Sequence, residues 1–264
     1  MQPGANKIEP MADIVIDTAA FRPLHMATCK VQCSNCNLRE ICIPVGLTRE
    51  KLGYVESRLA AVRRKVGRGE MLFHTGDKHD ALFAVWTGFF KTVITSEQGR
   101  EQIVGFHMAG ELIGFGGLGS GRHDVDAIAL EDSQVCVIPY AELASLEREV
   151  PQLQKQFHTL MSREIAADHE VMFLLGSMHA EERVAAFLLN LTHRLRARGF
   201  SASSILLRMS RGEIGNFLGL KLETVSRTLS KFQADRLLDV RQRQIGILDP
   251  AGLQRLLDGL PAAR

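Results

Sequence analysis

The stretch "MSRGEIGNFLGLKLETVSRTLSKFQ", residues 209–233, decides the fold. Ser210 is followed three positions later by Glu213, and this pair is a capping box that predicts the start of a helix. Gly219 permits a tight turn after that helix. A second helix is expected to begin two or three residues beyond this glycine. The pattern therefore predicts a helix-turn-helix.

The second helix of this motif has two distinct faces. Its apolar residues Val225, Leu229 and Phe232 are spaced for one buried face. In a helix-turn-helix the second helix enters the major groove, where Arg pairs with guanine and Glu accepts from cytosine. A helical hairpin with a solvated polar face is the alternative. The candidate DNA contacts on the polar face are Glu223, Ser226 and Arg227, with Ser230 beside them.

The surroundings of the motif support a polyanion partner. Residues 236–249, "RLLDVRQRQIGILD", predict two short strands around a polar turn, as in a wing. From His179 onward the chain carries 14 Lys and Arg against 8 Asp and Glu, whereas the remainder carries 18 against 22. A basic C-terminal part of this kind favours binding of double-stranded DNA.

Residues 151–178 predict one long helix, because Pro151 opens it and Gly176 is its only glycine. One stripe has the 3, 4, 3, 4, 3 spacing of a two-helix interface, which favours a homodimer. A stripe that packs on the chain's own barrel is the alternative, although Phe157, Leu160, Val171 and Leu174 offer a second apolar face for that purpose. The stripe consists of His158, Met161, Ile165, Asp168, Met172 and Leu175.

Asp168 is the anomalous member of this stripe. In a parallel homodimer its two copies lie near each other, and like charges in a partly dry interface repel. The stripe therefore predicts a weak dimer that needs a second influence to form.

Residues 49–150 predict a barrel or roll, because short β-prone runs alternate with glycines at turn-like intervals. The chain thus divides into an irregular segment 1–48, a roll 49–150, a helix 151–178 and a DNA-binding part 179–264. Of the 264 residues, 45% are hydrophobic and 23% charged, which excludes a disordered or membrane composition. With neither a signal peptide nor a membrane span, we expect a cytoplasmic protein.

Four of the five cysteines lie in "CKVQCSNCNLREIC", residues 29–42. Clustered cysteines in a reducing compartment bind metal more often than they form disulfides. Cys33, Cys36 and Cys42 form C-x₂-C-x₅-C, whereas structural zinc usually takes ligands in two close pairs. Three thiolates on one loop and a fourth elsewhere fit a larger cluster better. Cys136 lies in a predicted strand and, taken alone, is an ordinary buried cysteine.

The roll, long helix and winged helix-turn-helix, in this order, resemble the Crp/Fnr superfamily of bacterial transcription regulators. The resemblance implies an α+β fold with a cyclic-nucleotide-binding-like β-roll (jelly roll), a dimerisation helix and a C-terminal DNA-binding domain. The cysteine cluster, "EQIVGFHMAGELIGF", "AEERVAAFLLNL" and "RGEIGNFLGLKLETVSR" resemble the FNR branch, the oxygen-sensing fumarate and nitrate reductase regulators. In that branch the four matching cysteines hold an oxygen-labile 4Fe–4S cluster. They are Cys33, Cys36, Cys42 and Cys136, which leaves Cys29 surplus.

The FNR resemblance also implies partners. These are a second copy of the chain, palindromic DNA with TTGAT half-sites, and RNA polymerase. The hairpin "TSEQGREQ" resembles a loop that contacts the polymerase in this family, but Arg100 stands where an acidic residue is often found. We therefore expect an oxygen-responsive regulator of the aerobic/anaerobic switch.

Three other functions fit the sequence less well. A cyclic-AMP sensor needs an Arg-Ser/Thr-Ala run after "GELIGF", and the chain instead has "GSGRHDVDAIAL" with Asp124 and Asp126. An enzyme is not expected, because P-loop, G-x-S-x-G and H-E-x-x-H patterns are missing from the sequence. An iron–sulfur electron-transfer protein shares the cysteines but has no use for a helix-turn-helix.

Overall fold

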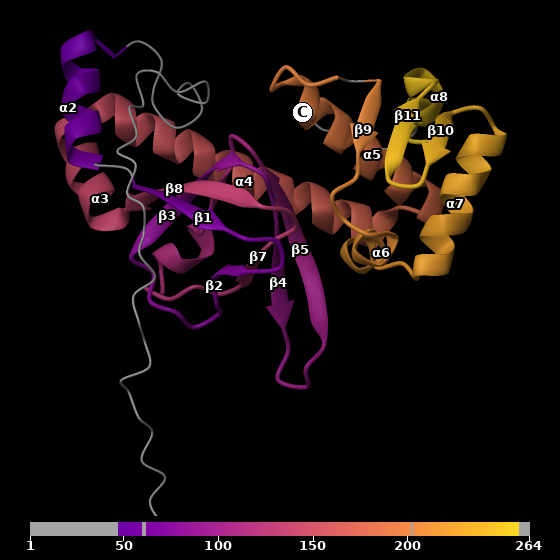
Figure 1. Cartoon of the computed structure of the whole chain (residues 1–264), viewed down its shortest axis with the longest axis horizontal. Helices are drawn as coiled ribbons and strands as arrows, with labels where there is room; N and C mark the ends of the chain where they lie inside the picture. Colours follow the sequence, from indigo (N-terminus) through magenta and orange to yellow (C-terminus); the bar gives the residue numbers. More distant parts are fainter. Residues whose placement is uncertain (1–46, 60–61, 202, 259–264) are drawn as a thin grey trace, which may run out of the picture.

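The computed structural model describes residues 47–59, 62–201 and 203–258, and within them the expected β-roll is present (Figure 1). Two four-stranded antiparallel sheets form the roll, with strand orders β1-β8-β3-β6 and β2-β7-β4-β5. The strands are β1 (Val62–Val66), β2 (Met71–Phe73), β3 (Ala81–Thr87), β4 (Phe89–Thr95), β5 (Glu101–Met108), β6 (Leu112–Ile113), β7 (Asp126–Ala129) and β8 (Ser133–Pro139).

The interior of the roll is apolar because alternate residues of each strand point inward. Val85 of β3 and Val135 of β8 are completely buried, and they share one hydrophobic cluster with Phe90 of β4. Members of both sheets contribute to this cluster, so the sheets enclose a single core.

The segment 49–150 also contains helices that the sequence analysis did not identify. They are α2 (Arg49–Leu59), a short 3₁₀ helix η3 (Phe115–Leu118) and α3 (Tyr140–Glu149). Val55 and Leu59 of α2 lie four residues apart and are both buried, since one helical face packs on the roll. Together with Leu146 of α3 they join a cluster that includes Leu82 of β3. These helices therefore pack against the outer face of the β1-β8-β3-β6 sheet at Leu82, with α3 between α2 and the strands.

The expected long helix is α4 (Pro151–Ser177). Leu153 and Phe157 near its start pack in the cluster formed with α2 and α3. Leu174 near its end packs in a different cluster, which holds the core of the C-terminal domain. Figure 1 shows α4 running from the β-roll to the end of the molecule that holds α5 and α7. The helix thus connects the two halves of the chain.

The C-terminal domain contains the predicted helix-turn-helix and a wing. Its elements are α5 (Ala180–Arg196), β9 (Ser204–Leu206), α6 (Arg211–Leu218), α7 (Leu222–Ala234), β10 (Leu238–Arg241), β11 (Gln244–Ile247) and α8 (Pro250–Arg255). The two predicted wing strands are β10 and β11, but the sheet has three strands in the order β10-β11-β9. Ile205 of β9 pairs with Ile245 of β11, and both are buried. A three-residue strand carries too short a pattern to be recognised in the sequence.

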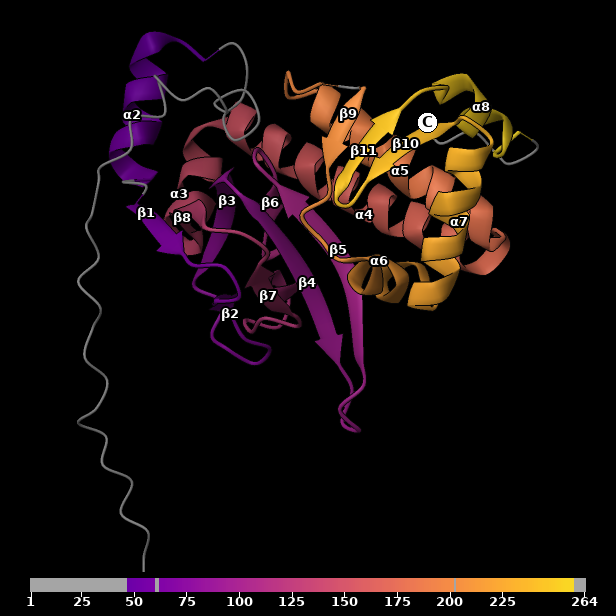
Figure 2. The same cartoon turned by 45° about the vertical axis from the view of Figure 1, so that its right-hand side comes forward.

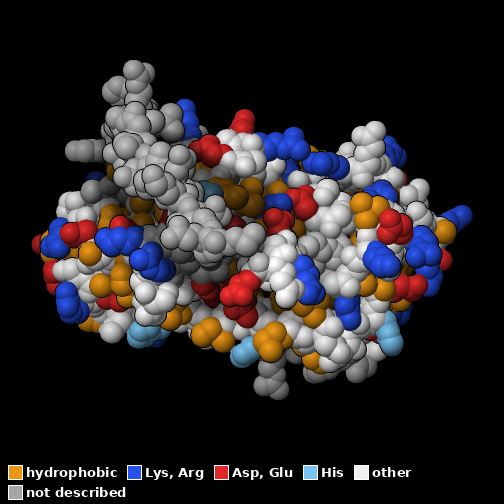
Figure 3. Space-filling view, turned by 90° about the horizontal axis from the view of Figure 1, so that it is seen from below, with side chains coloured by type: hydrophobic (Ala, Val, Ile, Leu, Met, Phe, Trp, Pro, Cys, Tyr) orange, Lys and Arg blue, Asp and Glu red, His pale blue; other side chains and the backbone are white. Residues whose placement is uncertain are grey.

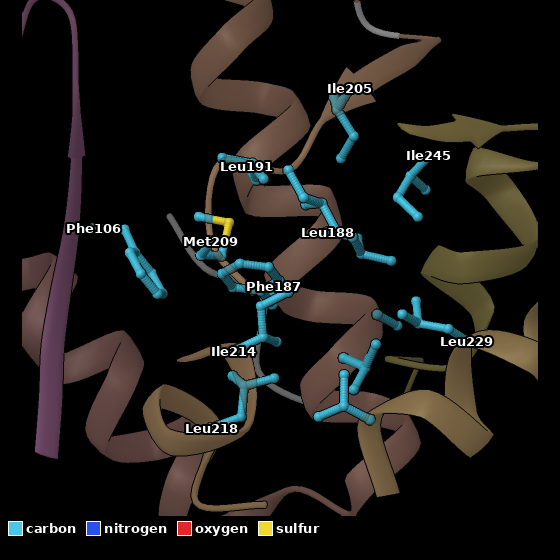
Figure 4. Packing of buried hydrophobic residues seen from close by; sticks show 14 of the residues in the cluster. Phe106, Phe187, Leu188, Leu191, Ile205, Met209, Ile214, Leu218, Leu229 and Ile245 are labelled. Carbon is cyan, nitrogen blue, oxygen red and sulfur yellow. The ribbon is translucent and has the colours of Figure 1, made fainter. Parts of the chain in front are cut away.

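The C-terminal domain is docked on the β-roll of the same chain. Phe106 of β5 lies 5.2 Å from the ring centroid of Phe217 in α6 and 6.1 Å from that of Phe187 in α5. Figure 4 shows Phe106 pointing from its strand toward Phe187 and Met209. Residues of β4 and β5 belong to the same buried cluster as the helix-turn-helix core. One continuous apolar core therefore joins the two domains, and Figure 2 shows α6 beside β5.

A buried ionic network lies at the edge of this contact. The Glu111 carboxylate, between β5 and β6, accepts from Arg194 at 2.6 Å and from Arg198 at 2.7 Å. Only 18% of the Glu111 side chain is exposed. Burial alone would raise the pKa of Glu111, but the charges and hydrogen bonds of the two arginines outweigh it and lower the pKa. Glu111 therefore stays ionised and ties α5 to the roll.

We expect Glu111→Gln to destabilise the fold by about 3 kcal/mol, because it leaves two partly buried guanidinium groups without their counterion. Urea unfolding followed by circular dichroism measures this loss. Asp80→Asn is the control, since it removes an ion pair whose side chains are 79% and 66% exposed. Such a pair contributes less than about 1 kcal/mol. Equal effects of the two substitutions would contradict the role of Glu111.

Candidate nucleic-acid interface

The first helix of the motif begins as its capping box predicts. The Glu213 amide donates to Ser210 Oγ at 3.1 Å, and the Ser210 amide donates to Glu213 Oε2 at 2.7 Å. The Glu213 carboxylate also pairs with Lys91 of β4 at 2.9 Å. The residue that caps α6 therefore also joins this helix to the β-roll.

The turn between α6 and α7 depends on two glycines. Gly219 has φ +63°, the left-handed conformation that ends many helices. Gly215 lies so close to the backbone of Leu220 that an added Cβ would be 2.6 Å from its carbonyl oxygen. The absence of a side chain at this position brings the two helices together.

The recognition helix α7 has the two faces predicted from its spacing. Val225, Leu229 and Phe232 are all at least 98% buried, as expected for the core face. Glu223 and Arg227 are exposed on the helix, whereas Ser226 is half-buried. The three candidate contacts thus lie on one helix whose opposite face is held in the core.

Three arginines of the C-terminal domain were missed in the sequence as candidate contacts. Arg211 at the start of α6 donates from Nη1 to Ser226 Oγ at 3.3 Å. Arg241 and Arg243 are exposed at the end of the β10–β11 hairpin. The hairpin pattern could have identified the latter two, since Arg side chains are common contacts to DNA phosphates. In Figure 3 the end of the molecule with the C-terminal domain shows several basic side chains among acidic and apolar ones.

Within one chain, only some residues of the α4 stripe are exposed to solvent. Ile165 is 54% and Met172 69% exposed, and Asp168 and His158 are exposed as well. By contrast, Met161 packs with the cluster formed by α2 and α3.

The remaining position of the stripe, Leu175, packs against the C-terminal core. The second apolar face packs inward as expected at Phe157 and Leu174, while Leu160 and Val171 are half-buried. The middle of the stripe is thus the part left open to a partner.

Only one member of the predicted cysteine set lies in the described part of the chain. Cys29, Cys33, Cys36 and Cys42 fall outside it, whereas Cys136 is a half-buried residue of β8. Among residues 47–59, 62–201 and 203–258, no group of three or more His, Cys, Asp or Glu side chains is arranged to hold a metal ion. A cluster held by this chain would therefore need cysteines of the N-terminal segment.

The region that would bind a cyclic nucleotide is occupied by internal contacts. Arg122 donates from Nη1 to the Gly76 carbonyl at 2.7 Å. Asp126 accepts from the Thr75 amide at 2.7 Å. The only arginine in this stretch is thus bound to the backbone of its own domain, which does not favour a phosphate site.

A nucleotide-binding-like β-roll, a connecting helix and a winged helix-turn-helix with an exposed polar recognition face define a DNA-binding transcription regulator. Two family descriptions match, a cyclic nucleotide-binding domain over residues 63–149 and a Crp-like helix-turn-helix domain over residues 182–256. The chain belongs to the Crp/Fnr family of regulators, which are not enzymes.

Known regulators are similar to this chain over most of its length. The fumarate and nitrate reduction regulatory protein of Escherichia coli K12 is 40% identical over 89% of this chain and 94% of its own length. The transcriptional activator protein Anr of Pseudomonas aeruginosa is 42% identical over 92% and 98%. The structure of FixK2 from Bradyrhizobium japonicum matches with a TM-score of 0.68 and 31% identity, covering 74% of this chain and 96% of that one. Each described helix falls short of the length and apolarity needed to cross a membrane.

We expect Gly215→Ala to abolish DNA binding and to lower stability by about 2 kcal/mol or more, since the added methyl group would collide with backbone. Gly212→Ala is a matched control on the same helix, because its Cβ would meet no atom closer than 3.6 Å. Thermal unfolding and an electrophoretic DNA-binding assay measure both variants. If Gly215→Ala binds DNA as well as Gly212→Ala does, the close approach is not essential.

Proposed function

We propose that this protein is an oxygen-responsive regulator of the aerobic/anaerobic switch, active as a homodimer on palindromic DNA. The proposal of DNA binding depends on one observation, namely that α7 presents Glu223 and Arg227 to solvent while its opposite face is buried in the core. The oxygen response is supported by the matching cysteines and by relatives named for fumarate and nitrate reduction. The proposed location is the cytoplasm.

The proposed sensor is a 4Fe–4S cluster held by Cys33, Cys36, Cys42 and Cys136. Thiolates are the ligands that such clusters take. Cys136 lies in the sheet on which α3 packs, α2 packs on α3, and the segment with the other three cysteines precedes α2 in the sequence. Cys136 is the one proposed ligand among the described residues, and its half-buried thiol on this sheet supports the proposal. When bound, the cluster would supply a site that oxygen destroys, and its loss would release the segment that it holds.

The proposed dimer contact is the open middle of the α4 stripe. Ile165 and Met172 present large exposed apolar side chains, and Asp168 lies between them. Burial of the apolar pair favours association, whereas repulsion between two Asp168 carboxylates opposes it. A small shift of α4 would then decide between monomer and dimer. A change of a few kcal/mol in the free energy of association converts a mostly monomeric protein into a mostly dimeric one.

In a dimer each recognition helix can occupy one of two half-sites about one helical turn apart. A monomer loses the second half-site and with it most of its specific affinity. The β4–β5 hairpin, with Arg100 exposed near its turn, is the proposed contact with RNA polymerase.

We expect anaerobically reconstituted protein to bind about one 4Fe–4S cluster per chain, visible as broad absorbance. Replacing Cys33, Cys36, Cys42 or Cys136 by Ser should remove the absorbance, because each substitution deletes a ligand. Cys29→Ser is the matched control and should retain it. Iron and sulfide analysis checks the stoichiometry, and one zinc per chain without iron would refute the cluster.

We expect Arg227→Ala to lose about 1–3 kcal/mol of binding free energy at the guanine of the half-site and to relax preference there. Binding to a set of half-site variants measures this. Arg243→Ala, on the wing, is the control and should weaken all sequences equally while reducing the salt dependence. A uniform loss for Arg227→Ala as well would make Arg227 a phosphate contact.

We expect cluster-free Asp168→Ala to form dimers and bind DNA in air, because the substitution removes the repulsion in the interface. Sedimentation of the cluster-free proteins at equal concentration measures the dimer fraction. Glu170→Ala, an exposed acidic position of α4 outside the stripe, is the control and should stay monomeric like the unmodified chain. If Asp168→Ala is also monomeric, this switch is wrong.

A further inference from the structure

A stacked pair of side chains spans the strand that carries Cys136. The guanidinium carbon of Arg63, on β1, lies 3.5 Å from the ring centroid of Trp86, on β3. Both strands pair with β8, which runs between them. The contact between Arg63 and Trp86 therefore passes over β8.

Arg63 and Cys136 lie on the same face of the sheet. Cys136 is the direct antiparallel partner of Arg63 on one side and of Ala84 on the other. Directly opposite residues of an antiparallel pair project to one face with their Cβ atoms about 5 Å apart. The adjacent residue Val135 is completely buried inside the roll, so Cys136 and Arg63 belong to the outer face.

The Arg63 charge has no counterion among the described residues, and its buried Nε atom has no hydrogen-bond partner. Its neighbours differ in this respect. Arg64 donates to the Leu72 carbonyl at 2.9 Å, and Arg58 pairs with Glu142 at 3.0 Å. A buried donor without an acceptor is destabilising and calls for an explanation. An anionic acceptor beside Cys136 would supply one.

We propose that Arg63 is a positioning residue for the iron–sulfur cluster, an inference that rests on the function proposed above. Stacked on Trp86, its guanidinium donates to sulfur at the Cys136 corner of the cluster, and the pair covers this corner against water and oxygen. Hydrogen bonds to cluster sulfur and nearby positive charge raise the reduction potential, so they make oxidative loss harder. Arg63 thereby sets how fast the protein responds to oxygen.

The test compares Arg63→Gln with Lys65→Gln, which removes the same charge from a more exposed position two residues along β1 on the same face. Each protein is reconstituted anaerobically and mixed with air-saturated buffer, and the decay of visible absorbance is followed. Arg63→Gln should shorten the half-life about tenfold, the low end of the ~10–100-fold losses of metal affinity or activity seen when outer ligand partners are replaced. It should also lower the reduction potential in a redox titration. Lys65→Gln should behave as the unmodified chain does.

Two further variants protect the test against misfolding. Arg63→Lys keeps the charge but loses the planar fork, and should shift the half-life part of the way. Trp86→Leu removes the stacking surface and should do the same. Thermal unfolding of the cluster-free proteins shows whether each variant folds. If Arg63→Gln does not fold, the half-lives of Arg63→Lys and Trp86→Leu test the role of Arg63 instead.

The outcomes separate this inference from the proposed function. The role of Arg63 is wrong if the visible absorbance of Arg63→Gln decays as slowly as that of the unmodified chain, or if Lys65→Gln accelerates the decay equally. Neither result contradicts the proposed cluster. If the unmodified chain takes up no cluster, the proposed function fails and the inference fails with it. That result is seen before any variant is compared.

Discussion

The arrangement of the two domains depends on the buried carboxylate of Glu111 between Arg194 and Arg198. The ion pairs act next to an aromatic contact in which Phe106 of β5 meets Phe217 of α6. Apolar contact alone is non-directional, whereas two guanidinium groups on one carboxylate fix a geometry. The position of the recognition helix is consequently set by the β-roll, because α7 is held by α6 and α6 rests on β5.

Backbone contacts also connect Glu111 to β8, the strand that carries Cys136. The Val85 amide of β3 donates to the Glu111 carbonyl at 2.9 Å, and Val85 is also the direct partner of Val135, next to Cys136. The residue that ties down the DNA-binding domain and the cysteine of β8 are therefore connected through a single strand. Sheets of this kind are stiff, so displacement at one point is felt at the other.

Local chemistry determined what could be predicted from the sequence. The capping box at Ser210, the turn at Gly219 and the core spacing from Val225 all act within a few residues, and the structure has each of them. In the Glu111 network, Arg194 and Arg198 are 83 and 87 positions away from Glu111 in the sequence, so no local pattern reveals the network. Likewise, the stack of Arg63 on Trp86 follows only from the strand register. The spacing of the α4 stripe did not reveal that Met161 and Leu175 also pack against the chain's own cores, because the partners of those contacts lie far away in the sequence.

The shared core also bears on how such a chain can be divided. Phe89, Ile103 and Phe106 of the β-roll are buried in one cluster with residues of the C-terminal helices. A fragment ending after α4 would expose this apolar surface on β4 and β5, and the complementary fragment would expose Phe187 and Phe217. Large exposed apolar patches promote association and aggregation. The two halves are therefore poor modules for exchange between chimeric proteins unless the β4–β5 surface is transferred together with the helices that cover it.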